Sequence, residues 1–180
     1  MTENGKEQEQ DQEQQSEQVI SAFETCDFRP EDVAEMAQLF RDAIRITAAD
    51  AYSPAQLAAW AKTVEDEQAF AARLGEGWVR IAVDDEGIVG FAKIDMPGHI
   101  DMLYTAPRAA RQGVATLLMD DMLTLGEAMG AAALTADASH VARALFVHFG
   151  FVETSTEIVE HHGENFIRHT MQRTMKRSRK

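Results

Sequence analysis

The spacing of apolar residues changes along the first half of this sequence, and the change limits which folds the chain can adopt. Between Val33 and Ile44 the large apolar side chains recur at intervals of three or four residues, which is the pattern of an amphipathic helix. From Trp78 to Ala106 apolar and polar residues alternate, which is typical of strands with one buried face. This change of period predicts a mixed α/β domain, and the short links between these strands favour antiparallel pairing.

The same patterns predict the order strand, helices, three strands, helix, strand, helix and two strands. Ser53 and Ser139 stand where helix N-caps are expected, and Gly150 stands where a helix would stop. The first strand alternates as expected for a half-buried edge strand, and we expect the lone thiol of Cys26, near its end, to be a small buried hydrophobe rather than a nucleophile. The expected strands are 21–28, 78–85, 88–95, 98–106, 131–138 and a pair within 151–175, and the expected helices are 30–44, 54–62, 65–74, 114–130 and 139–150.

Length and composition indicate one globular domain, because 180 residues with 45% hydrophobic content suffice for one core. We expect residues 1–20, rich in Glu and Gln, to be a disordered acidic tail, residues 21–175 to form the domain, and residues 176–180 to be a basic tail. The chain has no apolar run near the roughly 20 residues of a membrane span and no signal-peptide core, which predicts a cytoplasmic protein. Its formal charge of -13 disfavours binding to nucleic acid or to anionic membranes.

The passage HIDMLYTAPRAARQGVATLL carries the most chemistry. An apolar strand enters a loop with small residues at Ala109, Ala110, Gly113 and Ala115, and a long helix follows directly. Small side chains let backbone N–H groups approach an anion, and the helix N-terminus adds the positive end of its dipole. The loop therefore suits phosphate binding, although an ordinary tight strand-to-helix connection has the same composition. A dinucleotide fingerprint is absent from it.

The segment ARQGVA resembles the Q/R-x-x-G-x-G/A acetyl-CoA signature of the GNAT superfamily of N-acetyltransferases. LFVHFGF resembles the F-Y-x-x-x-G-F segment of the same family, and LTADAS resembles the strand and loop before it. The element order also matches, so the resemblance covers residues 21–175. DAYSPAQLAAWA with HIDMLYTAPRAARQGVA is similar to a bacterial subgroup of small-molecule acetyltransferases. The resemblance implies the GNAT fold, a mixed, mostly antiparallel sheet with splayed fourth and fifth strands and flanking helices.

The resemblance further implies acetyl-CoA as co-substrate. The loop amides would bind its pyrophosphate, and free backbone groups of Met102 to Tyr104, between the splayed strands, would pair with its pantetheine arm. The N–H of Leu103 would polarise the thioester carbonyl as an oxyanion stabiliser. The implied cofactor-binding residues are Met102, Leu103, Tyr104, Arg111, Gln112, Gly113, Val114, Ala115, Thr116, Ser139, Arg143 and Phe146.

Two residues depart from the family pattern. Ala110 occupies the first signature position, usually Gln or Arg, so Arg111 or Gln112 must supply the polar contact. Phe146 stands where many members carry the tyrosine that protonates the leaving thiolate. Because a thiol pKa is about 8.5, CoA can still leave as a thiolate, and losing the tyrosine lowers efficiency without forbidding the reaction.

The catalytic base is the least determined part of the site. His99 begins the fourth strand, near where some GNAT enzymes carry a glutamate, and Asp101 shares its strand face, so both are candidates. An exposed histidine at a strand entrance is the alternative for His99. Ser139 follows the fifth strand and is placed to orient CoA as well as to cap a helix. The remaining histidines lack ligand spacing, and we expect no metal.

Tyr52 and Trp60 precede the second strand, in the region that covers the acceptor pocket in this family. Aromatic walls there would suit an amine on an apolar or aromatic body, although Trp60 also fits simple helix-to-sheet packing. The resulting hypothesis is acetyl transfer from acetyl-CoA to a primary amine of a small molecule or peptide, in a homodimer by resemblance. The alternatives are an acyl-CoA-binding sensor without turnover, motivated by Phe146 and Ala110, and a non-enzymatic interaction module.

Overall fold

The computed structural model describes residues 22–175; the predicted acidic and basic tails, and the first residue of the predicted domain, lie outside the described residues. Seven strands and several helices follow one another in nearly the expected order. The strands are β1 (Glu24–Asp27), β2 (Trp78–Asp84), β3 (Gly87–Asp95), β4 (His99–Thr105), β5 (Ala133–Ala138), β6 (Val152–His161) and β7 (Glu164–Thr174). The helices are η1 (Pro30–Asp32), α2 (Val33–Asp42), η2 (Ala43–Thr47), α3 (Pro54–Ala61), η3 (Lys62–Val64), α4 (Glu67–Gly75), η4 (Pro107–Ala109), α5 (Val114–Ala128) and α6 (Arg143–His148).

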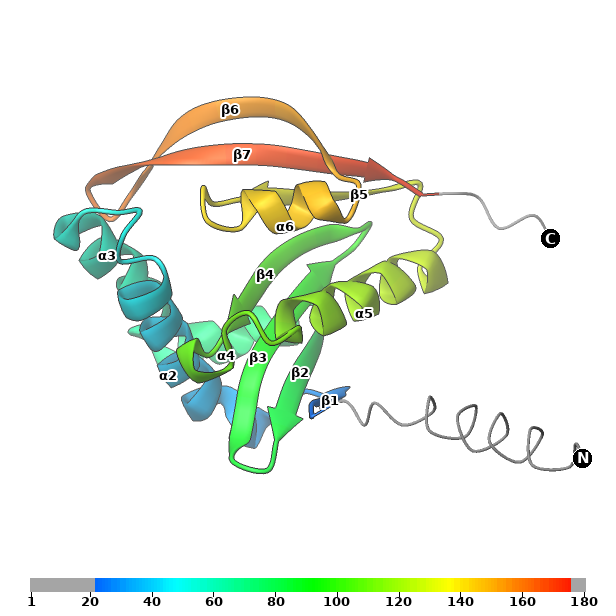
Figure 1. Cartoon of the computed structure of the whole chain (residues 1–180), viewed down its shortest axis with the longest axis horizontal. Helices are drawn as coiled ribbons and strands as arrows, with labels where there is room; N and C mark the ends of the chain where they lie inside the picture. The colour runs from blue at the N-terminus through cyan, green and yellow to red at the C-terminus, as the bar shows by residue number, and fades with distance from the viewer. Residues whose placement is uncertain (1–21, 176–180) are drawn as a thin grey trace, which may run out of the picture.

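The strands form one sheet in the order β1-β2-β3-β4-β5-β7-β6. Every neighbouring pair is antiparallel except β4 and β5, which run parallel because α5 crosses between them (Figure 1). The antiparallel arrangement predicted for the strands at 78–106 is confirmed, as is the predicted terminal hairpin.

The sheet opens between β4 and β5. Only His99 with Thr135 and Ile100 with Ala136 pair across this junction, after which the two strands separate. The splayed fourth and fifth strands that the resemblance implied are therefore present, and they leave a gap in the middle of the sheet (Figure 1).

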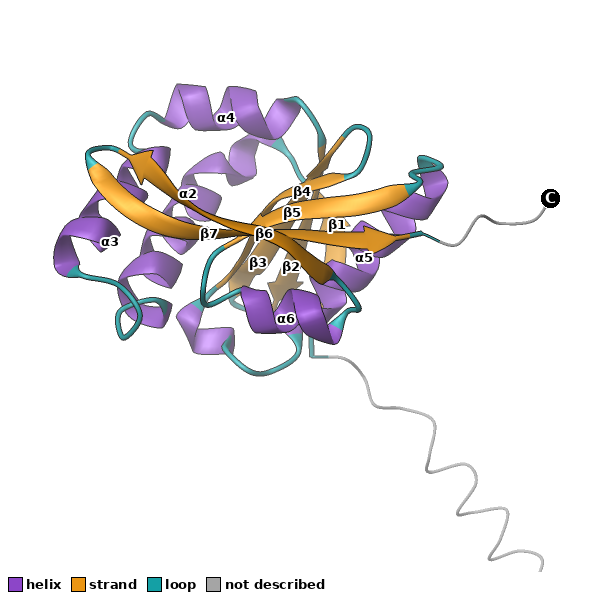
Figure 2. Cartoon of the chain, turned by 90° about the horizontal axis from the view of Figure 1, so that it is seen from above, coloured by secondary structure: helices purple, strands orange, loops and turns teal. Residues whose placement is uncertain are grey.

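Helices cover both faces of the sheet, with α2, α3 and α4 on one side and α5 and α6 on the other (Figure 2). The predicted stripe of α2 is buried, since Met36 and Phe40 are fully enclosed and pack with Phe70 of α4 and Phe91 of β3. On the other face Leu118 and Met122 of α5 pack against β3, β4 and β5. Gly90 of β3 makes this approach close, because a Cβ there would lie 2.8 Å from Val114 Cγ1 and 2.9 Å from Leu118 Cδ1.

Two local predictions were wrong. Cys26 is exposed rather than buried, because β1 is an edge strand that covers little of the core. The last helix begins at Arg143 rather than directly after Ser139. Ser139 Oγ does accept a hydrogen bond, from the Ala142 amide at 3.2 Å, but it closes a turn that precedes the helix. By contrast, Ser53 caps α3 as predicted, with its Oγ accepting from Gln56 N–H.

Candidate active site

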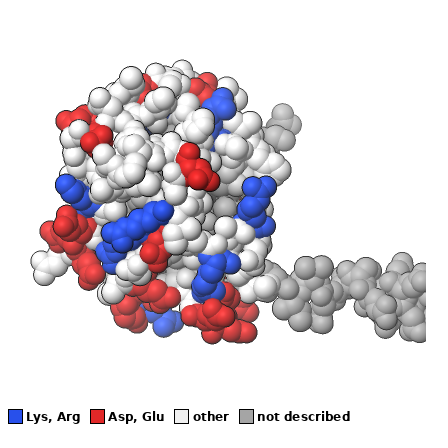
Figure 3. All heavy atoms as spheres, turned by 60° about the vertical axis from the view of Figure 1, so that its left-hand side comes forward, with Lys and Arg blue, Asp and Glu red and all other residues white. Residues whose placement is uncertain are grey.

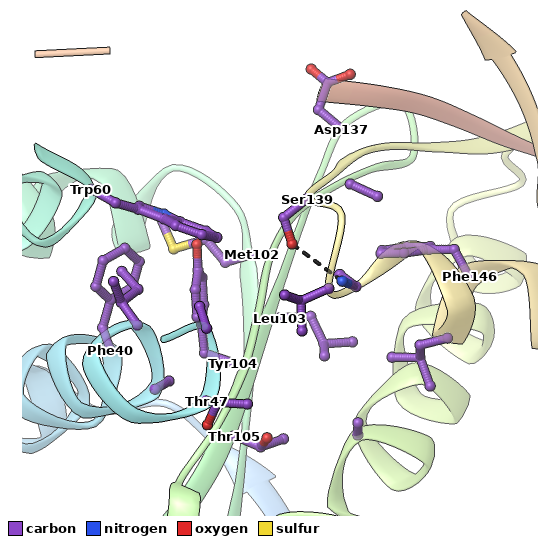
Figure 4. A pocket seen from close by; sticks show the side chains of 18 of the residues that line it. Phe40, Thr47, Trp60, Met102, Leu103, Tyr104, Thr105, Asp137, Ser139 and Phe146 are labelled. Carbon is purple, nitrogen blue, oxygen red and sulfur yellow. Dashed lines mark hydrogen bonds between the residues drawn. The ribbon is translucent and has the colours of Figure 1, made fainter. Parts of the chain in front are cut away.

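One cavity of about 1210 Å³ runs from the N-terminus of α5, through the gap between β4 and β5, to a pocket beneath α3. Its two ends differ in character. Figure 4 shows Tyr104 pointing from β4 towards Trp60, whereas Leu103 points to the opposite side, towards Phe146. The cavity thus contacts both faces of β4, and it joins the phosphate-type loop to the aromatic residues singled out from the sequence.

The turn before α5 has the geometry of an anion site. Gly113 is the N-cap residue with φ of 93°, a left-handed conformation that glycine adopts without strain, and open space surrounds it. The first helical bond runs from Leu117 N–H to Gly113 C=O at 3.0 Å, so the amides of residues 114–116 have no earlier carbonyl of their own helix. The first turn of α5 carries no acidic side chain, which leaves the positive end of its dipole uncompensated. A diphosphate fits these amides.

The gap between the strands exposes backbone groups of β4. Ala106 N–H donates to Val89 C=O of β3 at 2.8 Å, and the pairing direction alternates along an antiparallel strand. The N–H and C=O groups of Leu103 and Thr105 therefore point away from β3, into the gap. The backbone groups of Met102 and Tyr104 point towards β3 instead, which corrects the expectation that all three residues of 102–104 offer free groups.

The pocket beneath α3 is walled by aromatic rings. Tyr52 and Trp60 have centroids 5.3 Å apart, and Phe166 of β7 lies 5.9 Å from Tyr52 and 6.0 Å from Trp60. Tyr104 adds a fourth ring, 6.5 Å from Trp60. Burial raises the pKa of the Tyr104 phenol to about 12, so the group stays protonated and neutral at physiological pH.

A chain of alternating charges begins at this pocket, where Arg73 and Asp101 are lining residues. Arg73 of α4 donates to both carboxylate oxygens of Asp101, at 3.0 and 2.6 Å. The Lys93 ammonium, only 1% exposed, bonds to Asp101 at 3.2 Å and to Asp95 at 2.5 Å. Although burial opposes it, the bonds and charges of Arg73 and Lys93 lower the pKa of Asp101. Asp101 is therefore a fixed anion engaged by two cations, which makes it a weak proton acceptor.

His161 contributes a second titratable group to the same end of the cavity. Its Nε2 lies 3.0 Å from the Thr63 hydroxyl, which in turn donates to Trp60 C=O at 2.7 Å. Burial lowers the pKa of His161, and the charges of His162 and Arg73 lower it further against the opposing effect of Glu160. The imidazole is consequently neutral near pH 7.

Most sequence-predicted residues meet in the cavity. Those that line it are Tyr52, Trp60, Asp101, Met102, Leu103, Tyr104, Arg111, Gly113, Val114, Ala115, Thr116, Ser139 and Phe146. Three others are not among the lining residues, because each has a partner elsewhere. His99 Nδ1 lies 3.0 Å from Thr135 Oγ1, Gln112 donates to Arg108 C=O at 2.9 Å, and Arg143 pairs with Glu153 at 2.5 Å.

Sequence reasoning missed Arg73, Thr63, His161 and Phe166, which line the acceptor end of the cavity. They come from α4, η3, β6 and β7, and no local spacing connects them. The available signal was Phe166, which is the one Phe, Tyr or Trp residue among residues 152–175.

Known proteins share this fold. The model of the acetyltransferase (GNAT) domain matches residues 48–173, which is more than half of the chain. This chain belongs to the GNAT acetyltransferase family. An uncharacterised N-acetyltransferase of Escherichia coli K12, YafP, is 32% identical over 139 residues, covering 77% of this chain and 87% of that protein.

Solved structures agree with the GNAT assignment. A GCN5-related N-acetyltransferase from Rhodopseudomonas palustris is 38% identical with a TM-score of 0.84, covering 88% of this chain and 99% of that one. The PaiA N-acetyltransferase of Thermoplasma acidophilum, solved in complex with coenzyme A, has a TM-score of 0.70 at 16% identity, covering 85% and 99%. At that identity the second likeness concerns the fold alone.

The surface of this GNAT enzyme carries mixed charge. Figure 3 shows acidic and basic side chains lying beside one another on the face turned to the viewer. Within residues 22–175 no cluster of three or more His, Cys, Asp or Glu side chains is placed to hold a metal ion. Among the helices of that same part of the chain, none has the length and apolar character needed to cross a membrane.

Proposed function

We propose that this GNAT enzyme transfers the acetyl group of acetyl-CoA to a primary amine of a small molecule or peptide by direct attack. The observation that carries the proposal is the single cavity joining the α5 turn, the gap beside Leu103 and the aromatic pocket. Acetyl-CoA is long and flexible, and its thioester must meet the acceptor amine in the gap in the sheet. A continuous cavity allows the two substrates to approach from its opposite ends.

The α5 turn is the proposed site for the CoA pyrophosphate. The amides of residues 113–116 supply donors, and Arg111, which also lines the cavity, supplies charge. The free N–H of Leu103 is aimed into the gap and is suited to stabilise the oxyanion of a tetrahedral intermediate. Ser139 lies at the end of β5 on the opposite side of the gap, where it would help to orient the thioester.

The aromatic pocket is the proposed acceptor site. Tyr52, Trp60 and Phe166 form a wall that would bind the apolar or aromatic body of an amine, and their faces attract a cationic ammonium group. Arg73 and Asp101 line the same cavity, and their ion pair, with that of Asp101 and Lys93, fixes their positions beside the aromatic wall.

The second candidate is an acyl-CoA-binding sensor with little turnover, favoured by Phe146. Its side chain has no hydroxyl group, so the position offers no proton donor to a leaving thiolate. The ring is buried and packs edge-on against Phe151 at 5.1 Å. The two candidates differ in one measurable quantity, because only the enzyme releases CoA when an amine is added. The homodimer and the cytoplasmic location stay predictions; sedimentation would measure the first and cell fractionation the second.

Release of CoA on addition of an amine tests turnover, and the cofactor site is tested first by a thermal-shift titration with acetyl-CoA on wild type and Gly113→Trp. We expect saturable stabilisation of wild type that the variant loses, because an indole would fill the space before α5. Gly130→Trp is the matched control, since Gly130 also has a positive φ, of 68°, and nothing within 4 Å, but lies after the C-terminal end of α5, outside the cavity. No stabilisation of wild type at millimolar acetyl-CoA would end the proposal.

A further inference from the structure

His161 is held by a short chain of hydrogen bonds that determines where its proton lies. The Thr63 hydroxyl has one hydrogen and donates it to Trp60 C=O at 2.7 Å. At its contact with His161 Nε2, 3.0 Å away, Thr63 can therefore act only as an acceptor. Nε2 must then carry the hydrogen, which leaves the lone pair on Nδ1.

The Nδ1 atom is open to a ligand or to water. The described residues provide no hydrogen bond to Nδ1 of His161. Within residues 22–175 the buried side-chain N or O atom without a partner is His169 Nε2, so Nδ1 of His161, which also has no partner, is not fully buried. His161 itself lines the acceptor end of the cavity, together with Thr63, Trp60 and Phe166. A neutral imidazole with a fixed N–H on one side and an open lone pair on the other has the form of a general base.

We propose that His161 is the general base of acetyl transfer, with Nδ1 as the proton acceptor and Thr63 as the residue that fixes its tautomer. The inference rests on the proposed function, because it needs an amine acceptor in the aromatic pocket. It gives the role to a residue of the terminal hairpin instead of His99, whose ring is bonded to Thr135 outside the cavity.

The chemistry balances without another reactant. An ammonium substrate gives one proton to Nδ1, directly or through a cavity water, and becomes a free amine. The amine nitrogen attacks the thioester carbon, and a carbon–nitrogen bond forms. The carbon–sulfur bond then breaks, with its electron pair leaving on sulfur, and the second proton of the nitrogen neutralises the thiolate. His161 finally returns its proton to water.

The charges around His161 suit this role. Arg73 approaches it from α4, His162 and Glu160 lie beside it on the hairpin, and Glu164 is its cross-strand partner on β7. Of these, Arg73 and His162 disfavour a second positive charge, while Glu160 moderates the effect. The neutral form of His161 therefore dominates at neutral pH. As pH increases, kcat/KM should rise as His161 loses its proton, with a midpoint below about 6.5.

The test compares His161→Gln with His162→Gln, its exposed neighbour, in a Cys26→Ser background. The background matters because Cys26 is exposed and would react with the thiol reagent that measures released CoA. Tyramine and 2-phenylethylamine serve as first acceptors, followed by a panel of aliphatic amines. Acetyl-CoA thermal shifts are recorded for every variant.

We expect kcat to fall about 100-fold or more in His161→Gln. The rise of kcat/KM at low pH should disappear in this variant, while the thermal shift caused by acetyl-CoA should remain. His162→Gln should keep activity and move the limb slightly upward, since a repelling charge is gone. Thr63→Val should lower kcat and disturb the Nε2–H signal of His161 in long-range 1H–15N spectra, and Thr63→Ser should restore both.

Each other outcome overturns the inference in a distinguishable way. Full activity with an unchanged limb in His161→Gln would exclude the base role and leave the acetyltransferase function standing. Loss of the acetyl-CoA shift in that variant would make His161 a structural residue. Binding of acetyl-CoA without CoA release by wild type for any amine would remove the proposed function and the base with it.

Discussion

The Tyr52 phenolic oxygen accepts a hydrogen bond of 3.1 Å from the backbone amide of His140, 88 residues further along the chain. Tyr52 belongs to the loop before α3, on the acceptor side of the cavity, and His140 follows β5 on the cofactor side. The bond therefore ties the two walls of the active site together across the gap in the sheet.

Replacing Tyr52 with Phe should cut this tie while keeping the ring contacts with Trp60 and Phe166. Because the bond is exposed, we expect the free energy of unfolding to fall by only about 0.5 to 1 kcal/mol. The His140 amide should exchange its hydrogen faster in hydrogen-exchange experiments. The Arg143 amide, bonded to Ser139 C=O at 3.0 Å, is the internal control and should keep its rate. An unchanged rate at His140 would mean that the tie is absent in solution.

Asp101→Asn should be strongly destabilising. The Lys93 ammonium, which is 1% exposed, would keep Asp95 as its remaining carboxylate among the described ion pairs. Arg73 would lose the charge of its described partner. Breaking a buried ion pair costs about 3 to 5 kcal/mol, and the remaining Asp95 places this case near 3 kcal/mol. Urea denaturation measures the loss. Asp85→Asn, on the exposed β2–β3 turn, is the control and should change stability by less than about 0.5 kcal/mol.

Gly90→Ala should push α5 away from the sheet. The added Cβ would lie 2.8 Å from Val114 and 2.9 Å from Leu118, and overpacking of this kind costs about 1 to 3 kcal/mol. Since Val114 begins α5, we also expect a smaller thermal shift with acetyl-CoA. Gly75→Ala is the matched control, because its Cβ meets nothing and alanine favours the helix by up to about 1 kcal/mol. Equal stability of the two variants would contradict the close packing of α5 on β3.

Glu153 should make stability depend on acid. Hydrogen bonds from Thr156 and Arg143, together with His169, lower the pKa of its carboxyl from 4.5 to about 2. A carboxyl whose pKa is lower in the folded state stabilises that state above its unfolded pKa, and the contribution disappears as pH falls from about 4.5 to 2. The difference in urea midpoint between wild type and Glu153→Gln should therefore be clear at pH 6 and shrink towards pH 2.

The local elements were predictable where one face of a segment determines its structure. Met36 and Phe40 share a helical stripe, Ile81 and Phe91 follow strand alternation, and Gly113 is one of the small residues that marked the loop before a helix. These signals depend on neighbours in sequence, so the sequence alone carries them. The gap between β4 and β5 came from the family resemblance instead, since nothing in the residues of either strand requires them to separate.

The acceptor end was less predictable because its contacts are distant in sequence. Thr63 and His161 are 98 residues apart, and Arg73 and Asp101 are 28 apart, so no spacing rule connects them. His99 and Arg143 were singled out by position, yet side-chain partners on β5 and β6 occupy them. Cys26 was expected to be buried because cysteines that are not reactive usually are, but on this short edge strand the side chain stays exposed.

The two residue pairs that join β4 to β5 also have a mechanical consequence. The sheet is a continuous ladder on either side of them, so this junction is the seam along which it is least resistant to bending or shear. A ligand that lies in the gap and forms hydrogen bonds with the free backbone groups of Leu103 would add contacts between the two parts of the sheet. Binding of the cofactor would then reduce the relative motion of the two parts of the sheet, including residues that do not contact the ligand.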